Sequence, residues 1–191
     1  MSKFLLLLGP SGVGKSAIID ELLKLDAKFV YISPYMTRSL RPGEKNKIPI
    51  SEEQMNEMER RGEFLVVNTL FGGIRYGTPS LPIIQAFGAG DYPILDWPVD
   101  RLLVMRQTFP EQLFTVYISP PSIHVLRERL AKDGRDVDGT RLASAEKELQ
   151  RYLSSKYAGL YNLEIISKDN EILEIATKIY IGYLKSFKYA E

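Results

Sequence analysis

Apolar runs and amphipathic segments alternate along most of the chain. Five apolar runs have the length of a buried strand, at residues 3–8, 29–32, 92–95, 113–118 and 163–166. Segments with apolar residues at helical spacing lie between them, the first at residues 16–25. Further helices are predicted to end at Leu130 and to span residues 79–87, 141–152 and 171–187. This alternation favours an α/β fold, in which helices cover both faces of a parallel sheet.

Two stretches depart from the alternation. In the first, residues 38–47 are polar and predict an extended loop, and a serine followed by glutamates predicts a capped helix over 51–61. Short strands are predicted there at 64–67 and 74–77, on either side of two glycines. The second stretch, residues 132–140, is rich in charge and glycine and predicts a mobile loop, although a surface loop without a role has the same composition.

Composition narrows the possible functions. The chain has 191 residues, of which 45% are hydrophobic and 26% charged, as expected of one soluble globular domain. A net charge of +1 argues against nucleic acid or an anionic membrane as a partner. The chain contains no cysteine and only one histidine, His124, which excludes disulfides, thiolate metal sites and histidine clusters. The apolar run at residues 4–8 is too short to cross a bilayer and lacks the flanks of a signal peptide, so we predict a cytoplasmic protein.

The strongest chemical signal follows the first predicted strand. Residues 9–16 fit the pattern G-x-x-x-x-G-K-[ST] in full and stand between a strand and a helix, as a phosphate-binding loop requires. Its glycines let backbone N–H groups surround a phosphate, and the helix adds the positive end of its dipole. Lys15 is expected to reach the β- and γ-phosphates of ATP, and the Ser16 hydroxyl to bind Mg²⁺. The predicted nucleotide-binding residues are Gly9, Pro10, Ser11, Gly12, Val13, Gly14, Lys15 and Ser16.

A second anion site is suggested in the polar loop after residue 37. Arg38 and Arg41 are three residues apart, and two such guanidinium groups can hold one phosphate through forked hydrogen bonds. Their spacing alone favours a solvated surface pair over a binding site. Tyr76 precedes Gly77 and Thr78 in a predicted turn and offers a hydroxyl.

Several of these motifs occur in the order and approximate spacing found in guanylate kinases, which the chain resembles from Phe4 to its last helix. The motifs are residues 9–16, Thr37-Arg38, Arg41-Pro42-Gly43-Glu44, residues 62–65, Tyr76-Gly77-Thr78 and Pro120-Pro121-Ser122. The resemblance implies a P-loop NTPase fold of three layers that binds ATP and Mg²⁺. It implies a core of residues 1–32, 79–131 and 141–191, an acceptor-binding insertion at 33–78 and a lid at 132–140.

The resemblance also implies roles for individual side chains. Arg38, Arg41 and Tyr76 would hold the phosphate of the acceptor, with Ser33, Thr78 and Asp96 as further substrate-binding residues. Asp96 ends a predicted strand on the phosphate side, where it suits a water-mediated Mg²⁺ contact and equally a carboxylate that caps a loop. Three arginines in or near the lid would neutralise the transferring phosphoryl group: Arg129, Arg135 and Arg141. With the lid shortened, Arg135 is the weakest of these assignments.

The chain departs from guanylate kinases where they read guanine. Pro34 stands at their usual serine, Val66 at their glutamate and Pro98 at the second acid of Asp-x-Asp. A tyrosine that contributes to their phosphate site has no clear counterpart, because residues 45–50 are about three residues shorter than expected. Valine would leave the N–H donors of guanine unpaired, at about 1–3 kcal/mol for each buried group. Asn68, Asp96 and Asp100 are alternative partners for the base from another angle, and the sequence does not choose among them.

These departures leave the acceptor open between GMP and a sugar phosphate. Ribose 1,5-bisphosphate phosphokinases are similar to this chain at Tyr35-x-Thr37-Arg38, in the short 44–51 segment and at Gly134-Arg135-Asp136, and their acceptor has no base. The motifs shared with guanylate kinases favour GMP over that alternative. Guanylate-kinase-like protein-binding modules without activity are a third possibility, but those typically lose the phosphate loop, which is complete here. We therefore predict an ATP-dependent kinase of a small phosphate-bearing acceptor.

Overall fold

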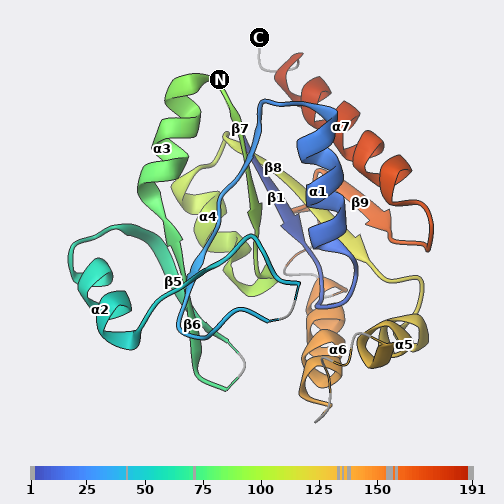
Figure 1. The fold of residues 1–191 in the computed structure, drawn as a ribbon. Coiled ribbons are helices and arrows are strands. Elements are labelled where there is room, and N and C mark those ends of the chain that lie inside the picture. The colour runs from blue at the N-terminus through green and yellow to red at the C-terminus, as the bar shows by residue number, and fades with distance from the viewer. Residues whose placement is uncertain are drawn as a thin grey trace.

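The core of the protein is a five-stranded parallel sheet with the strand order β2-β7-β1-β8-β9. The computed structural model describes residues 3–41, 43–70, 72–132, 134, 136, 139–153, 157 and 159–188. Figure 1 shows the sheet between two layers of helices. Its strands are β1 (Phe4–Leu8), β2 (Phe29–Tyr31), β7 (Tyr92–Asp96), β8 (Leu113–Ser119) and β9 (Leu163–Ile166). The predicted three-layer α/β fold is confirmed.

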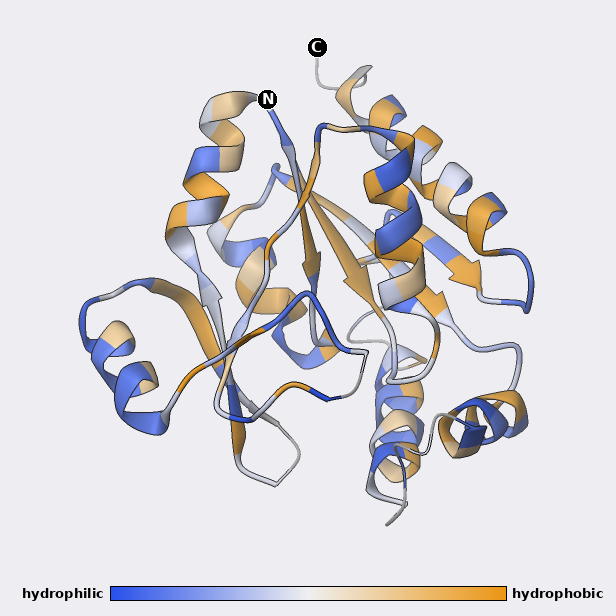
Figure 2. Cartoon of the chain, in the orientation of Figure 1, coloured by the Kyte–Doolittle hydropathy of each residue, from blue (hydrophilic) through white to orange (hydrophobic). Residues whose placement is uncertain are grey.

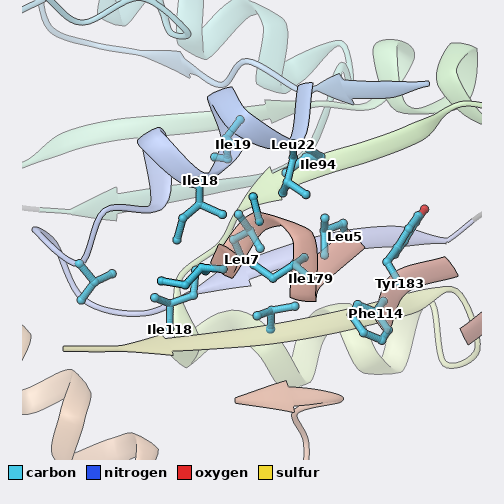
Figure 3. Close-up of a cluster of buried hydrophobic side chains, with 14 of the residues drawn as sticks. Leu5, Leu7, Ile18, Ile19, Leu22, Ile94, Phe114, Ile118, Ile179 and Tyr183 are labelled. Carbon is cyan, nitrogen blue, oxygen red and sulfur yellow. The ribbon is translucent and has the colours of Figure 1, made fainter. Parts of the chain in front are cut away.

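Strand β1 is apolar throughout because it is buried on both faces. Leu5 and Leu7 point to one hydrophobic cluster, whereas Phe4, Leu6 and Leu8 point to another on the opposite face. Figure 3 shows the first cluster, in which Ile18 and Leu22 of α1 and Ile179 of α7 meet the sheet. The alternating side chains of β1 therefore hold both helical layers to one sheet.

Helices α1 (Lys15–Leu25) and α7 (Ile172–Lys188) cover the first face. The second face is covered by α3 (Ser80–Ala89), the 3₁₀ helix η1 (Val99–Arg101) and α4 (Leu102–Thr108). Helices α5 (Ile123–Lys132) and α6 (Thr140–Tyr152) lie near the carboxyl ends of β1 and β8 in Figure 1. This end of a parallel sheet is where α/β proteins bind ligands.

A second, smaller sheet has the order β4-β3-β6-β5 and projects beside the core in Figure 1. Its strands are β3 (Tyr35–Met36), β4 (Ile48–Pro49), β5 (Phe64–Leu70) and β6 (Ile74–Pro79). Helix α2 (Glu52–Arg60) begins at the predicted cap, where Ser51 and Gln54 form a capping box. Figure 2 shows that α2 is largely hydrophilic, whereas the central strands are hydrophobic. This sheet is built from the segment for which an acceptor-binding insertion is predicted.

Of the predicted lid, residues 132–140, the structure describes Lys132, Gly134, Asp136, Gly139 and Thr140. Arg135 lies outside the described residues, so its predicted catalytic role stays a prediction. Within the described ranges, no helix combines the length and the apolar character needed to span a membrane.

Candidate active site

The predicted phosphate loop joins the end of β1 to the start of α1. Gly9, Gly12 and Gly14 all have positive φ angles, of 134°, 89° and 94°. A Cβ on Gly9 would come within 2.2 Å of the Ile118 carbonyl oxygen, so no other residue fits there without displacing β8. Gly14 is the N-cap of α1 and has no side chain to occupy the first amides of the helix. The loop therefore has the form of an anion-binding helix N-terminus.

Lys15 lies across this loop. Its ammonium group donates to the carbonyl oxygens of Gly9 and Pro10, the latter at 3.1 Å, and lies 3.7 Å from Asp96 Oδ1. Asp96 is the last residue of β7 and is level with Leu7 of the neighbouring strand β1. The sequence left open whether Asp96 contacts Mg²⁺ through water or caps a loop. Its position beside Lys15 supports the first interpretation, which places it in the phosphate site.

Arg38 and Tyr76 come together across the small sheet. Arg38 donates two hydrogen bonds of 2.7 Å to the Glu44 carboxylate, and its Nε donates to the Tyr76 hydroxyl at 3.2 Å. Its side chain is only 12% exposed, which excludes the alternative of a solvated surface arginine. The backbone N–H of Arg41 also donates to Glu44. The two arginines are thus organised by one carboxylate.

The Arg38–Glu44 ion pair makes stability depend on pH. Hydrogen bonds from Arg38 lower the pKa of Glu44 from 4.5 to about 2, so the folded state prefers the charged carboxylate. Its contribution is full above pH 4.5 and is lost as the pH falls towards 2. We expect Glu44→Gln to lower the free energy of unfolding at pH 7 by about 2 kcal/mol, and by much less near pH 3, in urea titrations.

Glu57→Gln is the matched control, because Glu57 and its partner Arg61 are both 55% exposed. That substitution should cost less than about 0.5 kcal/mol. A Glu44→Gln deficit of the same size at both pH values would show that charge on Glu44 does not stabilise the fold.

Two cavities meet at the phosphate loop. The wider one, of about 920 Å³, lies between α1 and the 41–47 loop, and the narrower one, of about 270 Å³, lies between the small sheet and α6. The two cavities share part of their lining, namely Ser11, Lys15, Tyr31, Arg41, Lys47, Asp96 and Arg141. Two ligands bound in these cavities would meet beside Lys15, which is the arrangement that group transfer between them requires.

The predicted site residues are distributed between these cavities. Ser16 and Arg129 line the wider cavity, and Tyr76 and Thr78 line the narrower one. Arg38 lines neither cavity and reaches the narrower one through its hydrogen bond to Tyr76. Ser33 is also absent from the lining of both cavities, although its neighbour Pro34 lines the narrower one. The prediction for Ser33 therefore finds no support in the geometry.

The predicted lid arginines have different surroundings. Arg141 donates to Ser11 Oγ of the phosphate loop at 3.1 Å and lines both cavities. Arg129 donates to the Ser167 carbonyl oxygen at 2.9 Å and to Asp169 at 2.7 Å. Arg141 is therefore the better placed of the two to reach a group between the cavities.

Lys47 and Glu148 are among the lining residues that the sequence did not predict. Lys47 Nζ lies 3.6 Å from Glu44 and 5.4 Å from the centre of the Tyr76 ring, which adds a third cation to the acceptor side. Glu148 on α6 has a buried Oε1 without a hydrogen-bond partner among the described residues, and burial raises its pKa, an effect that Lys15 opposes. A signal for Glu148 exists in the sequence, since Arg141, Ser144, Glu148 and Arg151 recur at helical spacing and all line the narrower cavity.

The fold and this site define the protein as a P-loop kinase, with a phosphate loop at the end of the first strand and a second anion-binding sheet facing it. The guanylate kinase family model matches residues 1–179. The guanylate kinase of Trichormus variabilis is 32% identical over 175 residues, covering 88% of this chain and 84% of its own. That of Desulfitobacterium hafniense is 34% identical over 167 residues, covering 84% and 82%.

A solved guanylate kinase structure from Anaplasma phagocytophilum superimposes with a TM-score of 0.76 at 23% identity, over 98% of this chain and 88% of that one. The structural likeness supports the fold, and the sequence matches support the family. The protein belongs to the guanylate kinase family. The comparisons thus favour a guanylate kinase over the sugar-phosphate kinase and over the non-catalytic module.

Proposed function

We propose that this protein transfers the γ-phosphoryl group of ATP to the phosphate of GMP, forming ADP and GDP. The observation that carries the proposal is the meeting of two cavities at Lys15. One is lined by the phosphate loop, and the other is lined by Arg41, Lys47 and Tyr76, whose hydroxyl accepts a hydrogen bond from Arg38. A GMP phosphate oxygen forms a bond to the γ-phosphorus as the bond from that phosphorus to the β-phosphate oxygen breaks. Both ATP and GMP are intracellular, so we place the reaction in the cytoplasm.

On the donor side, the loop amides and Lys15 would hold the β- and γ-phosphates of ATP. Arg141, beside Ser11, would neutralise the charge on the transferring group. Little covalent participation by the protein is needed, because positioning and charge stabilisation provide most of the acceleration in this chemistry.

The residues present fit a Mg²⁺ ion held together with the phosphates. The Ser16 hydroxyl and the Asp96 carboxylate are hard oxygen donors that line the same cavity. Within the described part of the chain no group of three or more His, Cys, Asp or Glu side chains could hold a metal. Mg²⁺ needs no such group, since it binds through one or two protein oxygens together with phosphates and water. When bound, the ion would neutralise phosphate charge and fix the orientation of the phosphates.

On the acceptor side, Arg41 and Tyr76 would hold the phosphate of GMP, with Lys47 as a further cation. Both Nη atoms of Arg38 donate to Glu44 and its Nε donates to Tyr76, so Arg38 would act by fixing the Tyr76 hydroxyl and by adding positive charge to this side. The cations would also reduce repulsion between the two phosphates as they approach one another.

Arg38→Ala should raise the KM for GMP by about a hundredfold and change the KM for ATP by less than about threefold, because the variant leaves Glu44 negative without its partner and Tyr76 without its donor, on the side of one substrate only. Initial rates with each substrate varied in turn measure both constants. Arg61→Ala is the matched control, since Arg61 lies after α2 with a side chain 55% exposed and lines neither cavity. Equal changes in the KM for GMP and the KM for ATP would contradict the proposal that the two substrates occupy separate cavities.

The direct test of the proposed function is ADP release that requires both ATP and GMP. ADP release that is independent of GMP would indicate hydrolysis and would refute the proposal.

A further inference from the structure

A carboxamide without a hydrogen bond is buried in the wall of the narrower cavity. Asn68 of β5 is 6% exposed, and its Oδ1 has no hydrogen-bond partner in the described part of the chain. Nearly all buried polar side chains in proteins have a partner. Because Asn68 lines a cavity, its missing partner can be supplied by a ligand bound there.

The pairing of β5 with β6 directs Asn68 into this cavity. Val66 lies opposite Thr78 and Asn68 lies opposite Tyr76 in the antiparallel register, so these two pairs share one face of the sheet. Tyr76 and Thr78 both line the narrower cavity, whereas Val66 packs against the hydrophobic cluster that contains Trp97. Val66 stands at the position of the glutamate in guanylate kinases, and the polar side chain on this face is instead Asn68, two residues further along β5.

The surroundings of Asn68 suit a flat ring rather than a phosphate. The cationic residues Arg41 and Lys47 also line the wider cavity, but Asn68 lines only the narrower one. On that side it is accompanied by Pro34, Trp97 and Pro98. The charged residues that also line this cavity, such as Asp100, Glu148 and Arg151, come from η1 and α6 and not from the small sheet. Apolar surface together with a few placed polar groups is typical of a site that orients an aromatic ligand.

We propose that Asn68 binds the guanine base of GMP, with Oδ1 accepting from N1–H and Nδ2 donating to O6. This inference rests on the proposed function. A carboxamide supplies one acceptor and two donors, and the N1–H and O6 edge of guanine offers the complementary pair. The assignment makes Asn68 a base-specificity residue that does not touch the reacting phosphates. Inosine monophosphate has the same N1–H and O6 edge, so Asn68 binds its base in the same way.

The test compares wild-type protein with Asn68→Leu, which keeps the shape of the side chain and removes its hydrogen bonds. Nuclear magnetic resonance titrations measure the dissociation constants of GMP, inosine monophosphate and ribose 5-phosphate, which carries no base. We expect the variant to bind both nucleotides about 10- to 100-fold more weakly, by similar factors, and ribose 5-phosphate as well as the wild type does. Thr69→Val is the matched control, because Thr69 is the next residue of β5 and is exposed.

Other results of these titrations would refute either the role of Asn68 or the proposed function. If Asn68→Leu binds GMP as tightly as the wild type does, the inference fails and the proposed function stands. Equal weakening of ribose 5-phosphate would show that Asn68 acts on the shape of the site or on the sugar phosphate, and not on the base. If wild-type protein binds ribose 5-phosphate but not GMP, the proposed function fails together with the inference.

Discussion

Replacing Lys15 by alanine should lower kcat for GDP formation by about a thousandfold or more. Its ammonium group lies over the carbonyl oxygens of Gly9 and Pro10, where the phosphates of a nucleotide would enter the loop. Charge developing on the phosphates in the transition state is stabilised by such a fixed cation, and the loss of one group of this kind costs about 10²–10³ or more in kcat. Single-turnover rates at saturating ATP and GMP measure this effect on the chemical step.

The fold should tolerate this change, because Lys15 belongs to neither hydrophobic cluster and its ion pair with Asp96 is long, at 3.7 Å. The thermal midpoint of Lys15→Ala should therefore stay close to that of the wild type. Lys178→Ala on α7, where Lys178 is paired with Glu174 on the surface and lines neither cavity, is the matched control and should keep full activity. A Lys15→Ala variant with more than about a tenth of wild-type kcat would contradict the assigned role.

The second large effect is expected at Arg141. Its guanidinium donates to Ser11 of the phosphate loop and lines both cavities, so it can reach a phosphoryl group in transit between them. Arginines that stabilise transferring phosphoryl groups contribute about 10³–10⁵ in kcat when they are supplied by a separate protein. For a group that is one of several cations, we expect Arg141→Ala to lower kcat by about 10²–10³ with less than about threefold change in either KM.

Stopped-flow measurement of the chemical step separates this effect from slower product release. Arg127→Ala on α5 is the matched control, since Arg127 is exposed and lines neither cavity. Arg129→Ala should have a smaller effect than Arg141→Ala, because Arg129 is engaged by Ser167 and Asp169. A larger loss at Arg129 than at Arg141 would reverse the assignment of the two arginines.

The strands of the core could be predicted because their sequence pattern is local. A strand buried on both faces, such as β1, is apolar at every position, and no other part of the fold is needed to recognise it. Strands β3 and β4 contain two residues each and have no pattern of their own. Strand β3 exists because Tyr35 and Met36 pair with Gly77 and Tyr76 of β6, a contact between segments about 40 residues apart that a local pattern does not contain. Strand β4 exists because it pairs in turn with β3.

The same distinction holds for the site. Residues 9–16 are contiguous, and their glycines have backbone conformations that only glycine adopts readily. The phosphate loop could therefore be predicted from the sequence. The position of Asn68 depends on the register of β5 against β6, and that of Lys47 depends on Glu44 and Tyr76. Val66 at the position of the family glutamate indicated a change in base recognition and left Asn68, Asp96 and Asp100 as candidate substitutes, but the sequence alone does not choose among them.

Whether the cavity beside the phosphate loop accepts GMP is measured most directly by kcat/KM in a coupled ADP-release assay with ATP and Mg²⁺. GMP, the other nucleoside monophosphates and ribose 1,5-bisphosphate are offered as separate acceptors, and Lys15→Ala serves as the control for contaminating kinase. We expect GMP to have the highest kcat/KM and the Lys15→Ala preparation to show no turnover above background. A higher kcat/KM for ribose 1,5-bisphosphate, or no turnover with any acceptor, would show that GMP is not the acceptor of this site.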